Sequence, residues 1–201
     1  MRWLDPPPPG TSVCGGFDGS TVSDCTVIKL ETIDGLLFTP RYGPDRRPTI
    51  WNPAEWGGNT PRAEVDAAVN EIAETYSLGR VYCDPWHFTS EIGAWAKRHG
   101  EDVFVEWHTN RDRPMHEALE LFVTDLGTGR LRHDGCPITT LHVQNARKLA
   151  RNGGRYIIGK PSQTQKIDAG MGSVLAHKAA VDARKAGWTD EQTDTRVFCF
   201  R

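Results

Sequence analysis

The chain alternates between short apolar runs and longer stretches that carry apolar residues at helical spacing. Three runs come first, at residues 13–17, 25–33 and 36–39, and glycine and aspartate residues separate them. Runs of this length, bounded by turn residues, predict a meander of three strands, and the alternation within 25–33 predicts a half-buried strand. The Pro- and Gly-rich residues 40–60 predict an irregular excursion over the surface, with its tryptophans as packing anchors.

Helices and strands alternate in the rest of the chain. Thr60-Pro61-Arg62-Ala63-Glu64 has the cap, proline and acid of a helix start, and Gly79 is the expected end of that helix. Apolar runs and helical periodicity predict the remaining elements. The expected strands are 80–84, 103–106 and 155–158, and the expected helices are 89–99, 114–126, 137–149 and 166–186.

This order of elements predicts the fold class. Parallel strands need crossover connections, and helices provide them by covering the faces of the sheet. A three-stranded meander, then helix, strand, helix, strand and a closing helix, is the element order of a ribonuclease H-like fold. We therefore expect an α/β protein with a mixed central sheet and helices on both faces. Small residues near the start of the last helix predict that it packs closely on the sheet.

The length of 201 residues predicts one domain with short extensions. The Pro-rich residues 1–12 predict an extended linker, the remnant of a connection to another domain. The domain itself is expected over residues 13–186, and residues 187–201 form a C-terminal tail without predicted structure. The sequence has no apolar stretch long enough to cross a bilayer and no signal peptide at its start, so we expect a cytoplasmic protein without a membrane partner.

The composition adds an asymmetry of charge. The formal net charge is −2, but residues 130–166 hold eight Lys and Arg against one acid, a net charge of +7 that leaves −9 on the rest. This predicts a surface for a polyanion on a protein that also holds cations, although a solvated basic face gives the same pattern. The candidate phosphate contacts are Arg132, Arg147, Lys148, Lys160 and Lys166.

Three aspartates lie where such a fold exposes side chains. Asp18 ends the first strand, Asp84 ends the strand 80–84, and Asp168 lies in the first turn of the last helix. Neighbouring strands are about 4.8 Å apart, so we expect the three carboxylates to meet. Carboxylates this close raise one another's pKa unless a cation lies between them. Oxygen ligands on an open site favour magnesium or manganese, and two such ions suit the hydrolysis of a nucleic-acid backbone.

Each acid also has a structural interpretation. Asp18 before a glycine is typical of a turn, Asp84 before a proline is typical of a strand end, and Asp168 complements the helix dipole. Their joint placement favours the metal site. Asp24, on the hairpin of Asp18, and the neighbours His133 and Asp134 are further candidates to support the metal ligands or the phosphate, with turn roles as the alternative.

Several motifs together resemble a known family, the C-terminal nuclease domain of bacteriophage terminase large subunits. They are GFDGS with SDCTVI, VYCDPWHF, GRLRHDGCPITTLHVQNA and KPSQTQKIDAGMGSVLA, and they cover roughly residues 13–186. The resemblance implies an endonuclease that cuts concatemeric viral double-stranded DNA during genome packaging in the host cytoplasm. It implies that Asp18, Asp84 and Asp168 are the acidic metal-binding triad.

The resemblance also implies partners that these residues do not include. A terminase carries an N-terminal ATPase domain and works with a portal and a small subunit, and we expect this chain to be the excised nuclease domain. Two alternatives stay open at this point. One is another ribonuclease H-like nuclease, such as a resolvase or transposase core, and the other is a non-catalytic module for DNA binding or portal docking. A zinc site is disfavoured, because the sequence has no CxxC pair and no HExxH motif.

Overall fold

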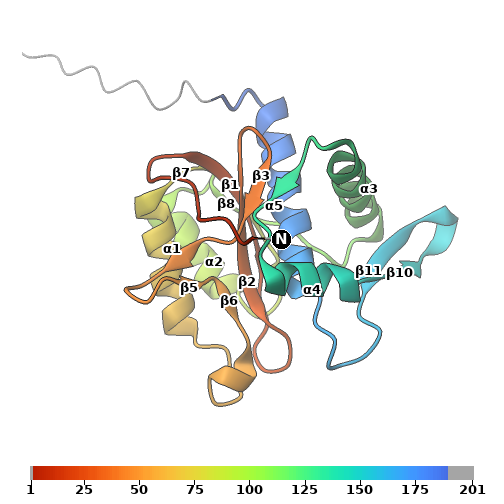
Figure 1. Cartoon of the computed structure of the whole chain (residues 1–201), viewed down its shortest axis with the longest axis horizontal. Coiled ribbons are helices and arrows are strands. Elements are labelled where there is room, and N and C mark those ends of the chain that lie inside the picture. The colour runs from red at the N-terminus through yellow and green to blue at the C-terminus, as the bar shows by residue number, and fades with distance from the viewer. Residues whose placement is uncertain (1, 190–201) are drawn as a thin grey trace, which may run out of the picture.

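A mixed seven-stranded sheet runs through the middle of the protein in the strand order β8-β7-β1-β2-β3-β9, with β6 paired to β2 (Figure 1). The computed structural model describes residues 2–189, so most of the expected tail, residues 190–201, lies outside the described part. The strands are β1 (Ser12–Asp18), β2 (Thr26–Thr32), β3 (Leu36–Phe38), β4 (Arg41–Tyr42), β5 (Arg47–Pro48), β6 (Ile50–Trp51), β7 (Ser77–Cys83), β8 (Phe104–Glu106), β9 (Arg132–His133), β10 (Arg147–Ala150) and β11 (Tyr156–Gly159).

Helices cover both faces of this sheet, as expected. The α-helices are α1 (Arg62–Thr75), α2 (Thr89–His99), α3 (Asp112–Thr128), α4 (Pro137–Asn145) and α5 (Asp168–Lys185), and two short 3-10 helices are η1 (Pro53–Glu55) and η2 (Asn152–Gly154). In Figure 1, α1 and α2 lie on one side of the sheet and α3, α4 and α5 on the other. Two apolar cores, one under α1 and α2 and one between α3 and α5, follow from this layering.

The strand β1 is the centre of the sheet. It pairs with β2 antiparallel and with β7 parallel, so its two neighbours come from a hairpin and from a crossover through α1. Six of its seven residues are buried, which explains why its sequence is a continuous apolar run.

The prediction that β2 is half-buried was wrong, because all seven of its residues are buried. Polar and apolar residues alternate along β2 because its polar side chains bind residues of α4 and α5. Lys29 donates hydrogen bonds through Nζ to Oγ1 of Thr139 (2.9 Å) and to Oγ1 of Thr39. Glu31 pairs with Nδ1 of His177 (2.8 Å), so the buried polar groups of this strand are satisfied within the protein.

The helix α5 packs directly on β1, as its small residues predicted. A Cβ atom on Gly16 would lie 2.3 Å from the carbonyl oxygen of Gly172, far inside van der Waals contact. Position 16 therefore requires glycine, and this close approach brings the first turn of α5 to the end of β1.

Two predicted helix ends were wrong. The helix α1 stops at Thr75 and not at Gly79, which lies within β7, because pairing with β1 draws these residues into the sheet. The helix α4 stops at Asn145, and residues 147–150 form the strand β10, which pairs with β11 in a separate hairpin that projects from the body (Figure 1). The expected strand 155–158 therefore exists as β11 but does not join the central sheet.

The Pro-rich start of the chain lies against the domain. The amide of Leu4 donates to the carbonyl oxygen of Asp134 (2.8 Å), and the amide of Gly10 donates to that of Thr75 (2.7 Å). Trp51, expected to anchor the surface excursion, is buried in the core with 1% of its surface exposed, while Trp56 is partly buried beside it. Among residues 2–189, no helix is both long and apolar enough to span a membrane.

Candidate active site

Two of the three aspartates leave the centre of the sheet side by side. Asp18 is the last residue of β1, and Asp84 directly follows β7. The two strands are parallel, with Phe17 opposite Cys83, and the amide of Asp84 donates a hydrogen bond to the carbonyl oxygen of Phe17 (3.0 Å). The carboxyl ends of parallel strands meet at one edge, which is where open α/β sheets place their sites.

The third aspartate comes from the opposite direction. Asp168 is the first residue of α5, and its Oδ2 accepts a hydrogen bond from the amide of Cys25 at the start of the β2 hairpin arm (3.0 Å). This bond ties the helix start to the loop that follows Asp18. The structure thus places Asp18, Asp84 and Asp168 around one cleft of about 340 Å³, although each comes from a different element.

The cleft is lined almost entirely by acids and by one loop. Residues 19–25, between β1 and β2, form one wall, and Trp86 and His87, after Asp84, form part of the other. Asp84 accepts a hydrogen bond from the hydroxyl of Thr109, which holds its carboxylate in place.

Burial and mutual repulsion perturb two of the carboxyl groups. Burial raises the pKa of Asp18 well above its usual range, and the charges of Asp168, Asp84 and Asp24 raise it further. Burial and the charge of Asp24 raise the pKa of Asp168 to about 6, against a smaller lowering by the amide of Cys25. Both shifts mean that ionisation of these carboxyl groups is disfavoured in the metal-free cleft.

The donor set of the cleft fits a hard divalent cation. Carboxylate oxygens are the ligands that Mg²⁺ and Mn²⁺ prefer, and a cation among them would offset the repulsion that raises the two pKa values. Within residues 2–189, no three His, Cys, Asp or Glu side chains lie close enough together to hold a metal ion as they stand. The fit therefore rests on the chemistry of Asp18, Asp84 and Asp168 and on their shared cleft.

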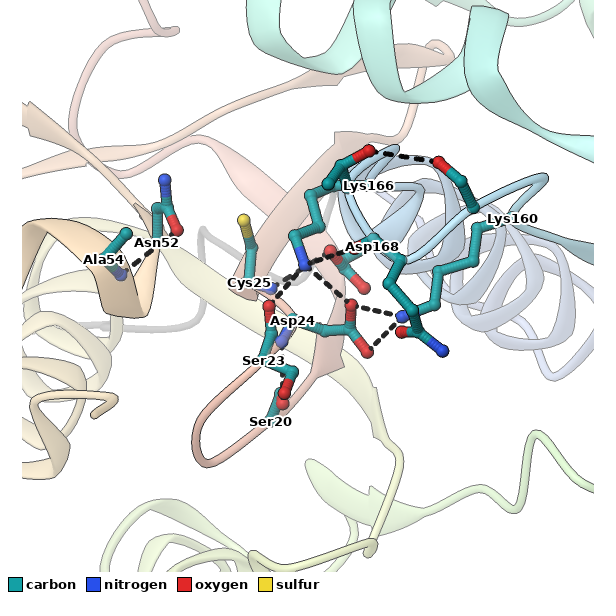
Figure 2. A network of polar contacts seen from close by, with 12 residues as sticks. Ser20, Ser23, Asp24, Cys25, Asn52, Ala54, Lys160, Lys166 and Asp168 are labelled. Atoms are coloured by element: carbon teal, nitrogen blue, oxygen red, sulfur yellow. Dashed lines mark hydrogen bonds and ion pairs between the residues drawn. The ribbon is translucent and has the colours of Figure 1, made fainter. Parts of the chain in front are cut away.

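Asp24 also lines the cleft, and two lysines hold it (Figure 2). Lys160 donates through Nζ to both carboxylate oxygens (2.6 and 2.8 Å), and Lys166 donates to Oδ1 (3.2 Å) and to the carbonyl oxygen of Ser23. Burial raises the pKa of Asp24, but these two lysines outweigh it and the net shift is downward. Two of the predicted phosphate contacts thus lie at the edge of the cleft, already paired with an acid.

Three other candidates lie elsewhere. His133 ends β9, the edge strand of the sheet, Asp134 follows it, and neither lines the cleft. Asp134 is buried and accepts hydrogen bonds from the amides of Thr39 (2.8 Å) and Cys136 (2.9 Å), so it organises a turn. Arg132, on the same strand, pairs with Asp34 (2.6 Å), also away from the cleft. Sequence alone did not separate this acidic loop from the active one, because both have an Asp near a Gly.

The remaining basic candidates lie on the projecting hairpin. Arg147 and Lys148 are exposed on β10, and Nζ of Lys148 lies 3.9 Å from the ring centre of Tyr156 on β11. The basic residues predicted to form one surface over residues 130–166 are therefore divided among three places. These are the edge strand β9, the β10–β11 hairpin, and the segment with Lys160 and Lys166, which bind Asp24.

The family model of the terminase large subunit endonuclease domain matches residues 46–183. The chain belongs to this family. Among curated proteins, the Gene 13 proteins of Mycobacterium phages L5 and D29 are each 29% identical over 188 residues, which cover 86% of this chain and 30% of theirs. The chain thus spans about a third of the length of these relatives.

Solved structures support the same fold. The large terminase of bacteriophage HK97 matches with a TM-score of 0.67 and 17% identity, over 87% of this chain and 40% of that one. The large terminase nuclease of thermophilic phage G20c matches with a TM-score of 0.64 and 14% identity, over 84% and 82%. The G20c nuclease is also known with bound magnesium (TM-score 0.60) and with bound cobalt (0.58). These matches confirm the predicted ribonuclease H-like fold of this terminase domain.

Three side chains in or beside the cleft were not predicted from the sequence as site residues. They are Val22 and Trp86, which line it, and Thr109, which holds Asp84. The motif VYCDPWHF contained the signal for Trp86, since a large aromatic residue directly after a strand-end Asp-Pro has no core to enter. Thr109 left no such signal, because only the parallel pairing of β7 with β8 brings it near.

Proposed function

We propose that this terminase domain is a divalent-metal-dependent endodeoxyribonuclease that hydrolyses phosphodiester bonds of double-stranded DNA. The observation that carries the proposal is the convergence of Asp18, Asp84 and Asp168 on one cleft from β1, β7 and α5. Membership of the endonuclease-domain family supports it, as do the magnesium and cobalt bound by the G20c nuclease.

In this proposal the three aspartates hold two Mg²⁺ or Mn²⁺ ions. Bound ions of this kind activate water and stabilise the leaving 3′ oxygen in phosphodiester hydrolysis. The protein's own contribution is position: Asp18 and Asp84 are fixed by the parallel pairing of their strands, and Asp168 by its bond from the amide of Cys25. All three belong to elements at the packed centre of the fold, so a bound metal would draw together side chains whose backbone is already fixed.

The basic residues would hold the DNA across the cleft. Lys160 and Lys166 lie at its edge, and Arg147 and Lys148 extend the positive charge along the hairpin. Contacts of this type bind phosphates and position the duplex without reading its sequence. Arg132 lies on the edge strand of the sheet, does not line the cleft and is paired with Asp34, so it is left out of the proposal.

The biological setting follows from the family. We propose that the domain cuts concatemeric viral DNA at the beginning and end of genome packaging, in the host cytoplasm. It would do so beside an ATPase domain, a portal and a small terminase subunit. The greater length of the L5 and D29 relatives supports a larger assembly of this kind.

The test is cleavage of supercoiled plasmid by the purified chain in magnesium, in manganese and in chelator. Asp18→Asn, Asp84→Asn and Asp168→Asn are each expected to abolish nicking and linearisation while the circular dichroism spectrum stays unchanged. Asp45→Asn is the matched control, because the Asp45 side chain is 78% exposed and lies on the β4–β5 turn. Cleavage that persists in chelator, or at the wild-type rate in one of the three variants, would contradict the proposal for the metal or for that residue.

A further inference from the structure

The two most exposed large apolar side chains in residues 2–189 both line the carboxylate cleft. Trp86 is 65% exposed and Val22 is 57% exposed. They belong to different loops, one after β7 and one between β1 and β2. Scattered apolar residues are common on protein surfaces, but two that line one acidic cleft from different loops indicate a binding contact.

The loop that carries Trp86 is anchored on both sides. Phe88 is fully buried and packs against Phe17 with the ring centres 5.0 Å apart. Arg62 lies over the Phe88 ring at 4.4 Å and donates a hydrogen bond to the carbonyl oxygen of His87 (2.8 Å). The indole of Trp86 therefore projects from a fixed backbone, and ordering this loop upon binding adds little entropic cost.

The loop that carries Val22 is anchored in the same way. The carbonyl oxygen of Ser20 accepts hydrogen bonds from the hydroxyls of Thr26 (2.9 Å) and Thr60 (2.6 Å). On the other side of Val22, Lys160 and Lys166 hold Asp24 (Figure 2). Val22 is thus presented at the tip of a loop whose two arms are fixed.

The charges of the cleft indicate what this apolar pair contacts. Four carboxylates line it, and its lining includes no Lys or Arg. A second protein with an acidic surface would be repelled by these carboxylates. A nucleic-acid base is apolar on its faces and arrives attached to a phosphate, which bound metal ions would attract.

We propose that Trp86 stacks on a base beside the cut phosphate and that Val22 contacts the neighbouring base, so that the strand is cut where its bases are unstacked. This inference rests on the proposed nuclease function and names the form of DNA that the site accepts. Apolar side chains that enter between base pairs partly unstack and kink a duplex. Pyrimidine–purine steps unstack most easily, so cuts are expected to be enriched at TA and CA steps.

The experiment compares two synthetic substrates, an intact duplex and the same duplex with a short mismatched bubble. Trp86→Ala is expected to cut the intact duplex roughly tenfold or more slowly, the loss of one base–aromatic stack. It should cut the bubble at close to the wild-type rate, because those bases are already unstacked. Trp86→Phe should retain most of the activity on both. Val22→Ala should act in the same direction more weakly, and its matched control is Val123→Ala, 54% exposed on α3.

A loss that is equal on both substrates would overturn the inference, since it would point to a general role of the loop or to a protein contact at Trp86. Binding of the same two substrates in chelator is measured by fluorescence anisotropy. It tests the contact of Trp86 with DNA even if the protein proves not to be a nuclease. Weaker binding of the intact duplex by Trp86→Ala than by the wild type, with binding of the bubble nearly unchanged, supports the contact even if no cleavage is seen. Equal binding of both substrates by the wild type and by Trp86→Ala contradicts it.

Discussion

The amide of Asp84 donates a hydrogen bond to the carbonyl oxygen of Phe17, the residue before Asp18, at 3.0 Å. This single bond continues the parallel pairing of β1 and β7 beyond the last paired residues, so the two acids leave the sheet together. The third acid, Asp168, depends on how closely α5 packs on β1. The geometry of the cleft is therefore set by backbone packing more than by contacts among the acidic side chains.

The close contact of β1 with α5 gives the first prediction. Gly16→Ala places a Cβ atom 2.3 Å from the carbonyl oxygen of Gly172 and 2.4 Å from the amide nitrogen of Ala176. Overpacking of a buried contact lowers the free energy of unfolding by about 1 to 3 kcal/mol, and backbone atoms have little freedom to yield. Urea unfolding followed by circular dichroism measures the change. The displaced α5 should also carry Asp168 away and slow plasmid cleavage.

The control for this prediction is Gly93→Ala in the interior of α2, where a Cβ atom meets no atom within 4 Å. Alanine favours a helix over glycine, so this variant should be more stable by about 0.5 to 1 kcal/mol. If both variants moved the urea midpoint in the same direction, the close packing of α5 on β1 would not explain the result.

A buried histidine predicts a loss of stability in mild acid. His142 on α4 is 5% exposed, and its Nδ1 accepts a hydrogen bond from the amide of Ala169 (3.1 Å). Burial lowers the pKa of His142 to about 4, and the charges of Lys166 and Lys29 add to the shift. The unfolded chain binds a proton near the ordinary value, 6.5, so stability is full above pH 6.5 and is lost as the pH falls toward 4.

Urea unfolding at pH 7 and at pH 5 measures this effect. The share due to His142 is a fall of about 1 to 2 kcal/mol between the two pH values. His142→Gln removes the titrating group and should reduce the fall by that amount, although it lowers stability at pH 7. Leu141→Ala, at an exposed position on the same helix, should leave the pH dependence as in the wild type. An unchanged fall in His142→Gln would assign the acid sensitivity to other groups.

The raised pKa values of the cleft predict proton release when metal binds. Because the pKa of Asp168 is about 6 and that of Asp18 is well above its usual range, the metal-free protein carries protons there at pH 6. A metal ligand must be deprotonated, so magnesium binding should release protons at pH 6 and should weaken as the pH falls further.

Calorimetric titration with magnesium chloride in two buffers of different ionisation enthalpy counts these protons. Asp168→Asn should release fewer protons than the wild type, whereas Asp45→Asn should release the same number. Binding heats that are independent of the buffer at pH 6 would show that the carboxyl groups are already ionised and would disprove the raised pKa values.

The division of the basic residues predicts different salt dependences. Lys148 is exposed on the projecting hairpin, and Arg132 is paired with Asp34 at the far edge of the sheet. If Lys148 neutralises one phosphate, Lys148→Gln should reduce the slope of log affinity against log salt by about 0.9. Arg132→Gln should leave the slope unchanged. The measurement is duplex binding in chelator over a range of salt, and equal slopes for both variants would reject the hairpin as a DNA contact.

The candidate site could be predicted in part. Asp18 and Asp84 were recognisable because an apolar run that ends in an acid before Gly or Pro places that acid at a strand end, whatever the remaining fold. His133 and Asp134 share the same local features, yet they lie at the opposite edge of the sheet. Local sequence indicates where a strand ends but not which other strand lies beside it. It therefore did not show that Asp18 and Asp84 line the cleft whereas His133 and Asp134 do not.

The sequence by itself determined the order and type of most elements and hence the ribonuclease H-like fold, because hydrophobic periodicity and turn residues act over a few neighbours. Only the tertiary structure decided the rest. Pairing with β1 ended α1 at Thr75, and pairing within the hairpin ended α4 at Asn145. Partners on α4 and α5 allow Lys29 and Glu31, respectively, to be buried inside β2. The physical reason is that long-range hydrogen bonding and packing override local propensity wherever the two compete.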